Sequence, residues 1–263
     1  MKGVLHLHST YSDGEFTLAE LRTMFLQAGC QFLCMTDHAE AFDESKLQVY
    51  REECASLSDS KLIIVAGLEY RCDRNMHILG YGAMQPSQSN DPQTVIRHID
   101  AQNAVSVIAH PRDEFFPWIE SFEVLPRGIE AWNSKYDGRY APRPGTFSLV
   151  RRLQSRKSDL RAFYGQDLHW KKQFRELFVL LNFESARSED ILVALARGEF
   201  SGEKSGLLLP SSGVLSDDLL LQFARSQKMS RSFRGYLKKG KQVLDRIGIK
   251  VPESIKAELR KVF

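Results

Sequence analysis

Six of the seven histidines in this 263-residue chain stand at or just after the end of a short apolar run with the composition of a β-strand. Two of them, His6 and His8, flank Leu7, and alternate residues of a strand point to the same side. The seventh, His98, lies in a helical pattern with no acidic or histidine partner at useful spacing. The six are His6, His8, His38, His77, His110 and His169.

Four carboxylates accompany these histidines at the same predicted strand ends: Asp13, Asp37, Glu69 and Asp167. A single histidine at such a place is most often an ordinary core or surface residue, but that reading does not account for six together. Barrel enzymes build their sites at the carboxyl ends of strands. Imidazole and carboxylate ligands suit Zn, Fe or Mn. The pattern therefore predicts a metal site that is large enough for more than one ion.

The segments that must position these residues alternate between strand-like and helix-like patterns. Helix signals include Thr17 as a candidate N-cap with Glu20 three residues later, which is a capping box. The predicted strands are Val4–His8, Phe32–Thr36, Leu62–Leu68, His77–Tyr81, Val105–Ala109, Gly128–Trp132, Ala162–Gly165 and Leu177–Asn182. The predicted helices between them are Thr17–Ala28, Asp43–Leu57, Pro92–Gln102 and Ser188–Arg197. Alternation predicts the α/β class with a parallel sheet, either closed into a barrel or open and doubly wound.

The pattern changes after Arg197, where glycine, serine and proline predict a loop-rich connection over 198–213. Leu215–Ser226 and Ser230–Ile247 are then expected to be helices, with a short helix after Pro252. We therefore expect residues 1–200 to form the barrel, and residues 201–263 a basic helical extension that packs on it or projects from it. Its basic residues are Lys228, Arg231, Arg234, Lys238, Lys239, Lys241 and Arg246.

Composition limits the class of protein. With 43% hydrophobic and 26% charged residues, the chain is suited to one soluble domain with a full core. No apolar run reaches 18 residues, and the N-terminus has no long apolar stretch, so neither a membrane span nor a signal peptide is expected. The four cysteines, Cys30, Cys34, Cys54 and Cys72, form no CxxC pair. We expect free thiols and a cytoplasmic location.

The order of these motifs resembles the PHP (polymerase and histidinol phosphatase) family of phosphoesterases. The resemblance covers about residues 3 to 185 and implies a distorted (β/α)7 TIM-like barrel with a trinuclear centre of Zn, Mn or Fe. The motifs that carry it are His6-Leu7-His8-Ser9, Ser12-Asp13-Gly14, Thr36-Asp37-His38, Gly67-Leu68-Glu69, His77-Ile78-Leu79-Gly80-Tyr81, Ala109-His110-Pro111 and Asp167-Leu168-His169.

The resemblance also implies how two or three divalent ions would be held. His6, His8 and Asp167 would bind one ion, with Glu69 bridging it to a second. His77 and His110 would complete the second site, and Asp13, His38 and His169 would hold the third ion. Asp37 is expected behind the ligands, where it accepts a proton from a ligating imidazole, or else as a helix cap or turn residue.

The implied activity is phosphoester hydrolysis by a metal-bound hydroxide held by His6, His8, Glu69 and Asp167. Arginines are expected to clamp the phosphoryl oxygens, because the guanidinium fork fits them in bidentate fashion. The candidates are Arg112, Arg139 and Arg143, with Lys135 as a further candidate.

The substrate is expected to be a small phosphomonoester, such as a nucleotide or sugar phosphate. Only 32 residues separate His77 from His110, too few for the extra helical subdomain usual in the nucleotide phosphatase and 5′–3′ exonuclease branch of the family. A nucleic acid substrate stays open because the tail is basic, but it is not favoured. Hydrolysis of a different bond, such as an amide, and a non-catalytic binding role also stay open.

Overall fold

Strands and helices alternate along most of the chain in the computed structural model, which describes residues 1–183 and 187–246. The first of two six-stranded sheets has the spatial order β12 (Leu207–Pro210), β11 (Phe200–Lys204), β10 (Phe178–Leu181), β1 (Lys2–Leu7), β2 (Phe32–Met35) and β4 (Ile63–Val65). The second has the order β3 (Asp37–His38), β5 (Gly67–Arg71), β6 (His77–Tyr81), β7 (Val105–Ala109), β8 (Gly128–Asn133) and β9 (Arg161–Gly165).

Two strand segments run from one sheet into the other. β2 continues through Thr36 into β3, and β4 continues through Ala66 into β5, with parallel pairing on both sides of the passage. At the other end of the series, the backbone N–H of Gln166 donates to the Leu5 carbonyl, and Leu7 forms a bridge with Leu168. The strand series β1 to β9 therefore curves round until its last strand meets its first, as in a barrel.

Most neighbours in this series are parallel, but β6 is antiparallel to both β5 and β7. A short connection can join antiparallel strands such as β5 and β6, whereas parallel strands need a crossover, usually through a helix. The predicted α/β class is confirmed. The antiparallel strand is the distortion that separates this arrangement from a regular (β/α) barrel.

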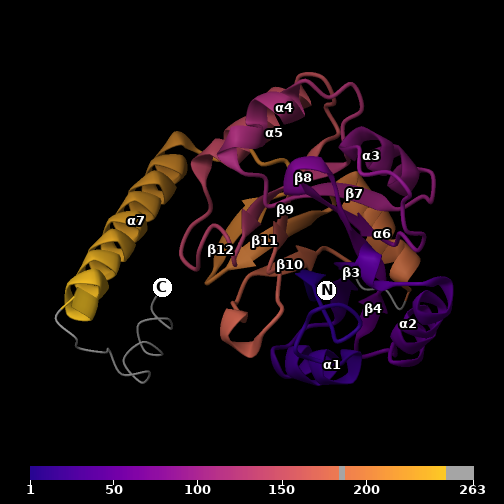
Figure 1. The fold of residues 1–263 in the computed structure, drawn as a ribbon. Coiled ribbons are helices and arrows are strands. Elements are labelled where there is room, and N and C mark those ends of the chain that lie inside the picture. The colour runs from indigo at the N-terminus through magenta and orange to yellow at the C-terminus, as the bar shows by residue number, and fades with distance from the viewer. Residues whose placement is uncertain (184–186, 247–263) are drawn as a thin grey trace.

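The helices lie around the outside of the strands (Figure 1). They are α1 (Leu18–Gln27), α2 (Glu44–Ser56), α3 (Pro92–Asp100), α4 (Phe116–Glu120), α5 (Pro144–Gln154), α6 (Ser188–Arg197) and α7 (Asp217–Arg246). Short 3₁₀ turns stand at Ala39–Ala41, Asp73–Asn75, Asp113–Phe115 and Lys171–Gln173. None of the helices in the described part of the chain is long and apolar enough to cross a membrane.

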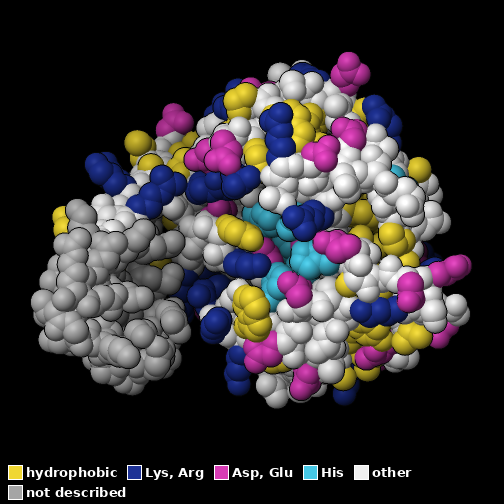
Figure 2. Space-filling model, in the orientation of Figure 1, with side chains coloured by type: hydrophobic (Ala, Val, Ile, Leu, Met, Phe, Trp, Pro, Cys, Tyr) yellow, Lys and Arg dark blue, Asp and Glu magenta, His cyan; other side chains and the backbone are white. Residues whose placement is uncertain are grey.

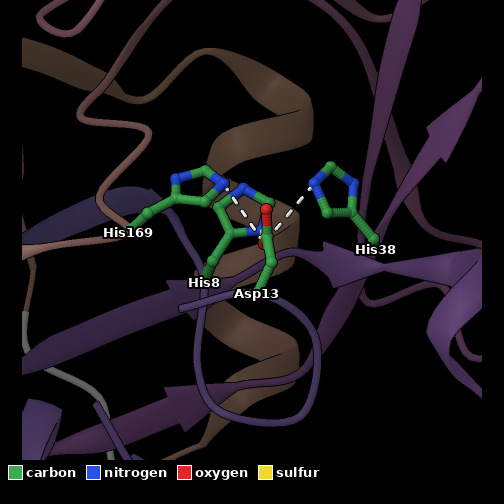
Figure 3. A group of neighbouring side chains, drawn as sticks. All are labelled: His8, Asp13, His38 and His169. Carbon is green, nitrogen blue, oxygen red and sulfur yellow. Dashed lines mark ion pairs between the residues drawn. The ribbon is translucent and has the colours of Figure 1, made fainter. Parts of the chain in front are cut away.

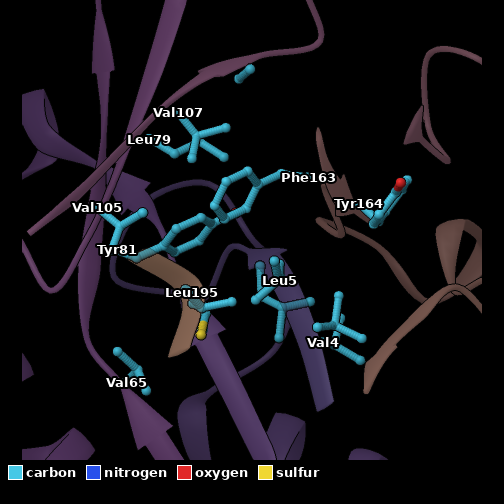
Figure 4. Packing of buried hydrophobic residues seen from close by; sticks show 14 of the residues in the cluster. Val4, Leu5, Val65, Leu79, Tyr81, Val105, Val107, Phe163, Tyr164 and Leu195 are labelled. Carbon is cyan, nitrogen blue, oxygen red and sulfur yellow. The ribbon is translucent and has the colours of Figure 1, made fainter. Parts of the chain in front are cut away.

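An apolar core fills the space that the strands enclose (Figure 4). Leu5 of β1, Tyr81 of β6 and Phe163 of β9 are each no more than 1% exposed. Leu195 of α6 joins the same cluster, and α6 contacts both β4 and β7. This packing fixes the strands relative to one another, and with them the residues at the strand ends.

The predicted loop over residues 198–213 is wrong in its central part. β11 and β12 form an antiparallel hairpin there, and β11 pairs with β10, so the first sheet continues beyond residue 200. Alternation of residue types in Phe200–Lys204 is weak, and the turn residues Ser205 and Gly206, both with positive φ, dominate the sequence pattern. The division into a barrel at 1–200 and an extension at 201–263 stays a prediction.

One continuous helix, α7, replaces the two helices predicted after residue 214. The stretch from Gln227 to Met229 contains no helix breaker, so nothing ends the helix at that point. Phe223 packs against Trp132 and Phe147, and the Gln227 amide donates to the carbonyls of Asp137 and Ala141. The rest of α7 extends away from the strands (Figure 1).

Lys228 and Arg231 of the basic segment are partly or fully exposed on α7. The side chains of Arg234, Lys238, Lys239, Lys241 and Arg246, and the helix predicted after Pro252, lie outside the described part of the structure. The four cysteines are buried free thiols, as expected, and burial raises the pKa of Cys30 and of Cys72 to about 12.

The capping box of α1 offers a test of the fold. The Thr17 hydroxyl accepts from the backbone N–H of Glu20, and the Glu20 carboxylate accepts from the backbone N–H of Thr17. We predict that Thr17→Ala lowers the free energy of unfolding by about 1 kcal/mol, because the first turn of the helix loses the acceptor for one of its free N–H groups. Thr23→Ala, at an exposed position inside the same helix, is the control and should change it by less than about 0.5 kcal/mol. Equal values for both variants in denaturant titrations would contradict the role of the cap.

Candidate metal centre

The six histidines and three of the carboxylates converge at one end of the strands. β1 carries His6 and leads directly to His8, β3 ends with His38, β5 carries Glu69, β6 begins with His77 and β7 ends before His110. The turn after β9 supplies Asp167 and His169, and the loop after β1 supplies Asp13. In Figure 2 the histidines lie in a hollow of the visible face, with basic and acidic side chains around it.

Three of these residues have a positive φ although they are not glycine: His6 (64°), His110 (29°) and Asp167 (53°). The register of β1 on β2 shifts between Leu5 and Leu7, so His6 occupies a bulge. Such a conformation costs of the order of 1–3 kcal/mol per residue and is kept only where the surroundings fix it. His6 and His8 were predicted to point to the same side of a regular strand. Both side chains do reach the centre, but the strand that carries them is bulged at His6.

Glu69 is the central residue of the cluster. It is 1% exposed, and imidazole nitrogens of five histidines lie within 3.5 Å of its carboxylate. The contacts are with His77 at 2.8 Å, His8 at 3.2 Å, His38 at 3.4 Å, His110 at 3.4 Å and His6 at 3.5 Å. A carboxylate that contacts histidines on both of its oxygens has the position that a bridging ligand needs.

Asp13 is the carboxylate around which His8, His38 and His169 gather (Figure 3). Its Oδ1 lies 3.2 Å from Nε2 of His169, 3.6 Å from Nε2 of His38 and 3.7 Å from Nδ1 of His8. The Asp13 side chain is 53% exposed, whereas His8 is fully buried. This group is therefore the part of the cluster that solvent reaches.

All nine residues predicted as ligands fall into four overlapping groups whose ligand atoms lie within 4.8 Å of one another. The groups are His8, Asp13, His38 and His169; His6, His110 and Asp167; His6, His8 and Glu69; and Glu69, His77 and His110. The predicted third and second sites correspond to the first and last of these groups. The number of ions and the distribution of ligands among them stay predictions.

Buried ring nitrogens without a hydrogen-bond partner show that the residues fit a metal centre. Among the described residues these are Nε2 of His6, both nitrogens of His8 and Nδ1 of His38. Leaving buried polar atoms unpaired costs free energy. Divalent ions would satisfy all four, because neutral imidazole nitrogens and carboxylates form the donor set that Zn, Mn and Fe accept.

The electrostatics of the cluster also favour a cation. Burial opposes the charged form of Glu69, but His6 and the hydrogen bonds from His110 and His77 outweigh it and hold the pKa of Glu69 well below its usual range. The pKa of Asp167 is likewise held low, against burial, by His6 and His169. Burial dominates at His8 and lowers its pKa. Anionic carboxylates thus face a neutral imidazole in a buried space.

Glu130 contacts the candidate ligands, and it was not identified from the sequence. It is 1% exposed on β8, and its carboxylate accepts from Nδ1 of His6 at 2.9 Å, from the backbone N–H of His110 at 2.8 Å and from the Asn133 amide at 2.8 Å. A carboxylate only accepts, so Nδ1 of His6 carries a proton, and Nε2 is the ring nitrogen that a metal ion would bind. An acidic residue between apolar neighbours in a predicted strand was the available signal.

Gly165 makes room for this arrangement. A Cβ atom at Gly165 would lie 1.9 Å from Oε1 of Glu130 and 2.9 Å from Cβ of His6. Any side chain there would displace the carboxylate that orients His6. The glycine at the end of β9 is therefore part of the support of the centre.

The Asp37 carboxylate binds the loop that follows β1. It accepts from the backbone N–H of Ser9 at 2.8 Å, from the Ser9 hydroxyl at 2.9 Å and from the Ser12 hydroxyl at 2.7 Å. These bonds hold the loop that carries Asp13. The carboxylate that contacts Nδ1 of His6 is Glu130, and a contact of Asp37 with a ligating imidazole stays a prediction.

Two of the cations predicted as phosphate ligands, Arg143 and Arg139, do not contact the ligand groups in the contacts that the structure gives them. The Arg143 guanidinium donates to Asp137 at 2.5 Å, to Asp113 at 2.6 Å and to the Pro111 carbonyl at 2.7 Å, and its role as a phosphate ligand stays a prediction. It joins the loops after β7 and β8. Arg139 lines a separate pocket with Lys172 and Arg175, and none of the predicted metal ligands lines that pocket.

Two further cations lie at the centre. Nζ of Lys135 is 2.9 Å from Oδ1 of Asp167 and 3.3 Å from Nδ1 of His169. Arg112 shares a pocket of about 250 Å³ with His77 and His110. Lys135 and Arg112 are thus the predicted cations that lie beside the ligand groups.

No family model matches the chain. Part of it is similar to the DNA polymerase/3′-5′ exonuclease PolX of Bacillus subtilis (strain 168), with 42% identity over 40 residues, which is 15% of this chain and 7% of that protein. A two-domain protein of Bacteroides vulgatus, described as containing a predicted PHP-like metal-dependent phosphoesterase, has a similar structure, with a TM-score of 0.57 at 17% identity over 86% of this chain and 69% of that one.

An amidohydrolase of Chromobacterium violaceum is similar over 73% of this chain and 96% of its own, with a TM-score of 0.52 at 16% identity. These likenesses concern the fold, and they confirm that the chain has the PHP-like fold which the sequence motifs predicted.

The support by Glu130 can be tested without an activity assay. We predict that Glu130→Gln weakens binding of Zn²⁺ or Mn²⁺ by about 10- to 100-fold, since an amide in place of the carboxylate no longer accepts from all three donors around it. The measurement is the metal content of the protein after equilibrium dialysis at graded free-metal concentrations. Glu114→Gln, on an exposed surface, is the control and should bind metal as the unmodified protein does. Unchanged affinity in Glu130→Gln would refute the orienting role.

Proposed function

We propose that this protein is a metal-dependent hydrolase that cleaves small phosphomonoesters. The observation that carries the proposal is the buried Glu69 carboxylate among five imidazoles, beside four buried ring nitrogens that lack a partner. The PHP-like fold supports it, because a neighbour with that fold is described as containing a metal-dependent phosphoesterase.

The residues of the centre have distinct tasks in this proposal. Glu69 would join two ions, His77 and His110 would complete one site, and Asp13 with His38 would hold an ion on the solvent side. Ions bound there supply Lewis acidity, which lowers the pKa of water and neutralises charge on phosphoryl oxygens. Two or three ions of Zn, Mn or Fe match the donor set.

The surroundings of the centre can orient a phosphoryl group. Lys135 is half-buried beside Asp167, and that contact raises the pKa of its ammonium against the effect of burial. It therefore stays cationic at the edge of the centre. Together with Arg112, which lines the pocket beside His77 and His110, it would contact the non-bridging oxygens of a phosphoester while water attacks phosphorus in line.

A small substrate is favoured over a polymer because the pocket that adjoins His77 and His110 has a volume of about 250 Å³. The short similarity to a DNA polymerase/3′-5′ exonuclease keeps phosphodiester hydrolysis as a second candidate, for which the sequence led us to expect a 5′–3′ exonuclease. The structural neighbour described as an amidohydrolase keeps amide hydrolysis as a third. A cytoplasmic location belongs to the proposal, and the four buried free thiols support it.

Phosphate release from a panel of phosphomonoesters, with Mn²⁺, Zn²⁺ or Fe²⁺ supplied, tests the proposal. We predict release that a chelator abolishes and that added metal restores, because the bound ions activate the attacking water. Metal-loaded protein that releases no phosphate, but cleaves an oligonucleotide or an amide, would replace the proposed substrate class with the one that is cleaved.

A pair of histidine variants localises the activity. We predict that His8→Ala loses at least about 10³-fold in kcat/KM, since both of its ring nitrogens face the ligand groups and their loss removes bound metal. His98→Ala is the matched control, because Nε2 of His98 faces the carbonyl of Gln85 and the residue belongs to none of the ligand groups. Circular dichroism should show the same secondary structure for both. Activity surviving in His8→Ala would count against this site.

A further inference from the structure

A small pocket opens directly beside the ligand group formed by Glu69, His77 and His110. His77 and His110 are partly exposed there, at 22% and 11%, while Glu69 behind them is buried. Arg112, Phe115 and Tyr136 line the pocket together with the two histidines. The part of a substrate bonded to phosphate would therefore enter this space when phosphorus lies at the centre.

Aromatic rings form two sides of the pocket. The Tyr136 ring lies against the His110 ring, with centroids 4.4 Å apart and an interplanar angle of 37°. Phe115 is 6% exposed and contacts Trp118 edge-on, which fixes its orientation. Tyr136, by contrast, is 55% exposed, although His110 and Nζ of Lys135, which is 5.2 Å from the ring centroid, lie against its ring. Part of the ring surface is therefore open at the pocket.

Arg112 stands at the rim of the same pocket. Its guanidinium lies over the Phe115 ring at 4.4 Å, pairs with Glu114 at 3.1 Å and donates to the Arg74 carbonyl at 3.3 Å. The side chain is 55% exposed, and a guanidinium has five N–H donors. Donors therefore remain for a ligand whose ring reaches the Phe115 side of the pocket.

We propose that this pocket binds an aromatic ring, so that the substrate is a phosphomonoester whose alcohol carries a flat ring. The inference rests on the proposed function and adds the substrate class. Stacking on Tyr136 and an edge contact with Phe115 favour a planar ring over a saturated one of the same size. In the reaction, water forms a bond to phosphorus, the bond from phosphorus to the alcohol oxygen breaks, and a proton passes to that oxygen.

A matched pair of probes isolates the ring. Benzyl phosphate and cyclohexylmethyl phosphate are primary alkyl esters of similar size, and they differ in the planarity of the ring. The quantity measured is the ratio of their kcat/KM values on the full-length, metal-loaded protein. We expect the unmodified protein to favour the benzyl ester by about three- to tenfold, the range that aromatic contacts contribute.

Variants assign the preference to the pocket. Tyr136→Ala should bring the ratio close to one, and Tyr136→Phe should keep it, because the ring and not the hydroxyl makes the contact. Tyr140→Ala is the matched control, since Tyr140 is also 55% exposed but does not line the pocket. A ratio near one in the unmodified protein, or an equal ratio in Tyr136→Ala and Tyr140→Ala, would overturn the proposal while the phosphatase function stands.

Calorimetric binding of benzylphosphonate and cyclohexylmethylphosphonate separates the pocket from the catalytic function. If neither ester releases phosphate, the panel of phosphomonoesters decides the proposed function, and the binding ratio of the phosphonates tests the pocket by itself. Preferential binding of the benzyl compound that Tyr136→Ala abolishes supports the aromatic site. Equal binding of both compounds overturns it.

Discussion

The buried carboxylate of Glu69 is the constraint on which the arrangement of the centre depends. A carboxylate with 1% exposure is costly unless positive charge compensates it, and five imidazole nitrogens lie within 3.5 Å of this one. The five rings cannot supply that charge together, because protonated imidazoles at such distances repel one another. Divalent cations between carboxylate and imidazoles would resolve both problems, since they compensate the anion and use the nitrogen lone pairs.

The fold holds this arrangement at a cost in backbone conformation. Positive φ values at His6, His110 and Asp167 are unfavourable for residues with side chains, and each lies at or just beyond the end of a strand. The bond from the backbone N–H of His8 to the Leu168 carbonyl and the bonds of Glu130 to His6 and His110 keep them in place. The strain thus lies in the same short segments that hydrogen bonds across the centre support.

Some charged residues around the centre hold its loops in place, and others lie where a substrate would bind in the proposed function. Asp37 and Arg143 lie close to the cluster, but their charges join loops: Asp37 binds Ser9 and Ser12, and Arg143 ties the loop after β7 to the loop after β8. Lys135, Arg112 and Tyr136 remain at the edge of the centre with exposed or half-buried surfaces. In the proposed function, strand ends therefore set the chemistry, and the segments that follow β7 and β8 set the selectivity.

Local pattern was enough to predict the class of the fold and a metal site of histidines and carboxylates at strand ends, and the resemblance to the PHP family implied which of them are ligands. Strand composition, the capping box at Thr17 and the motif order carried this, because burial and local hydrogen bonding act over a few residues. Spacing placed His6 with His8, and Asp167 with His169, on the side of the chain that faces the cluster, although it could not show the bulge at His6. Strand composition, capping and residue spacing can each be recognised within a short stretch of the chain.

Packing between distant segments determines which charged residues contact the ligand groups and which contact the surrounding loops. The sequence does not distinguish Arg143 from Arg112. In the structure, Arg143 donates to Asp113 and to the Pro111 carbonyl, which are 30 or more positions away in the chain. Glu130 acts on His6 across 124 residues, and its room depends on Gly165, which no local pattern reveals. Likewise, the hairpin of β11 and β12 forms where β10 offers an edge to pair with. Such contacts join segments that are distant in sequence, and their energies depend on the packed arrangement of the strands.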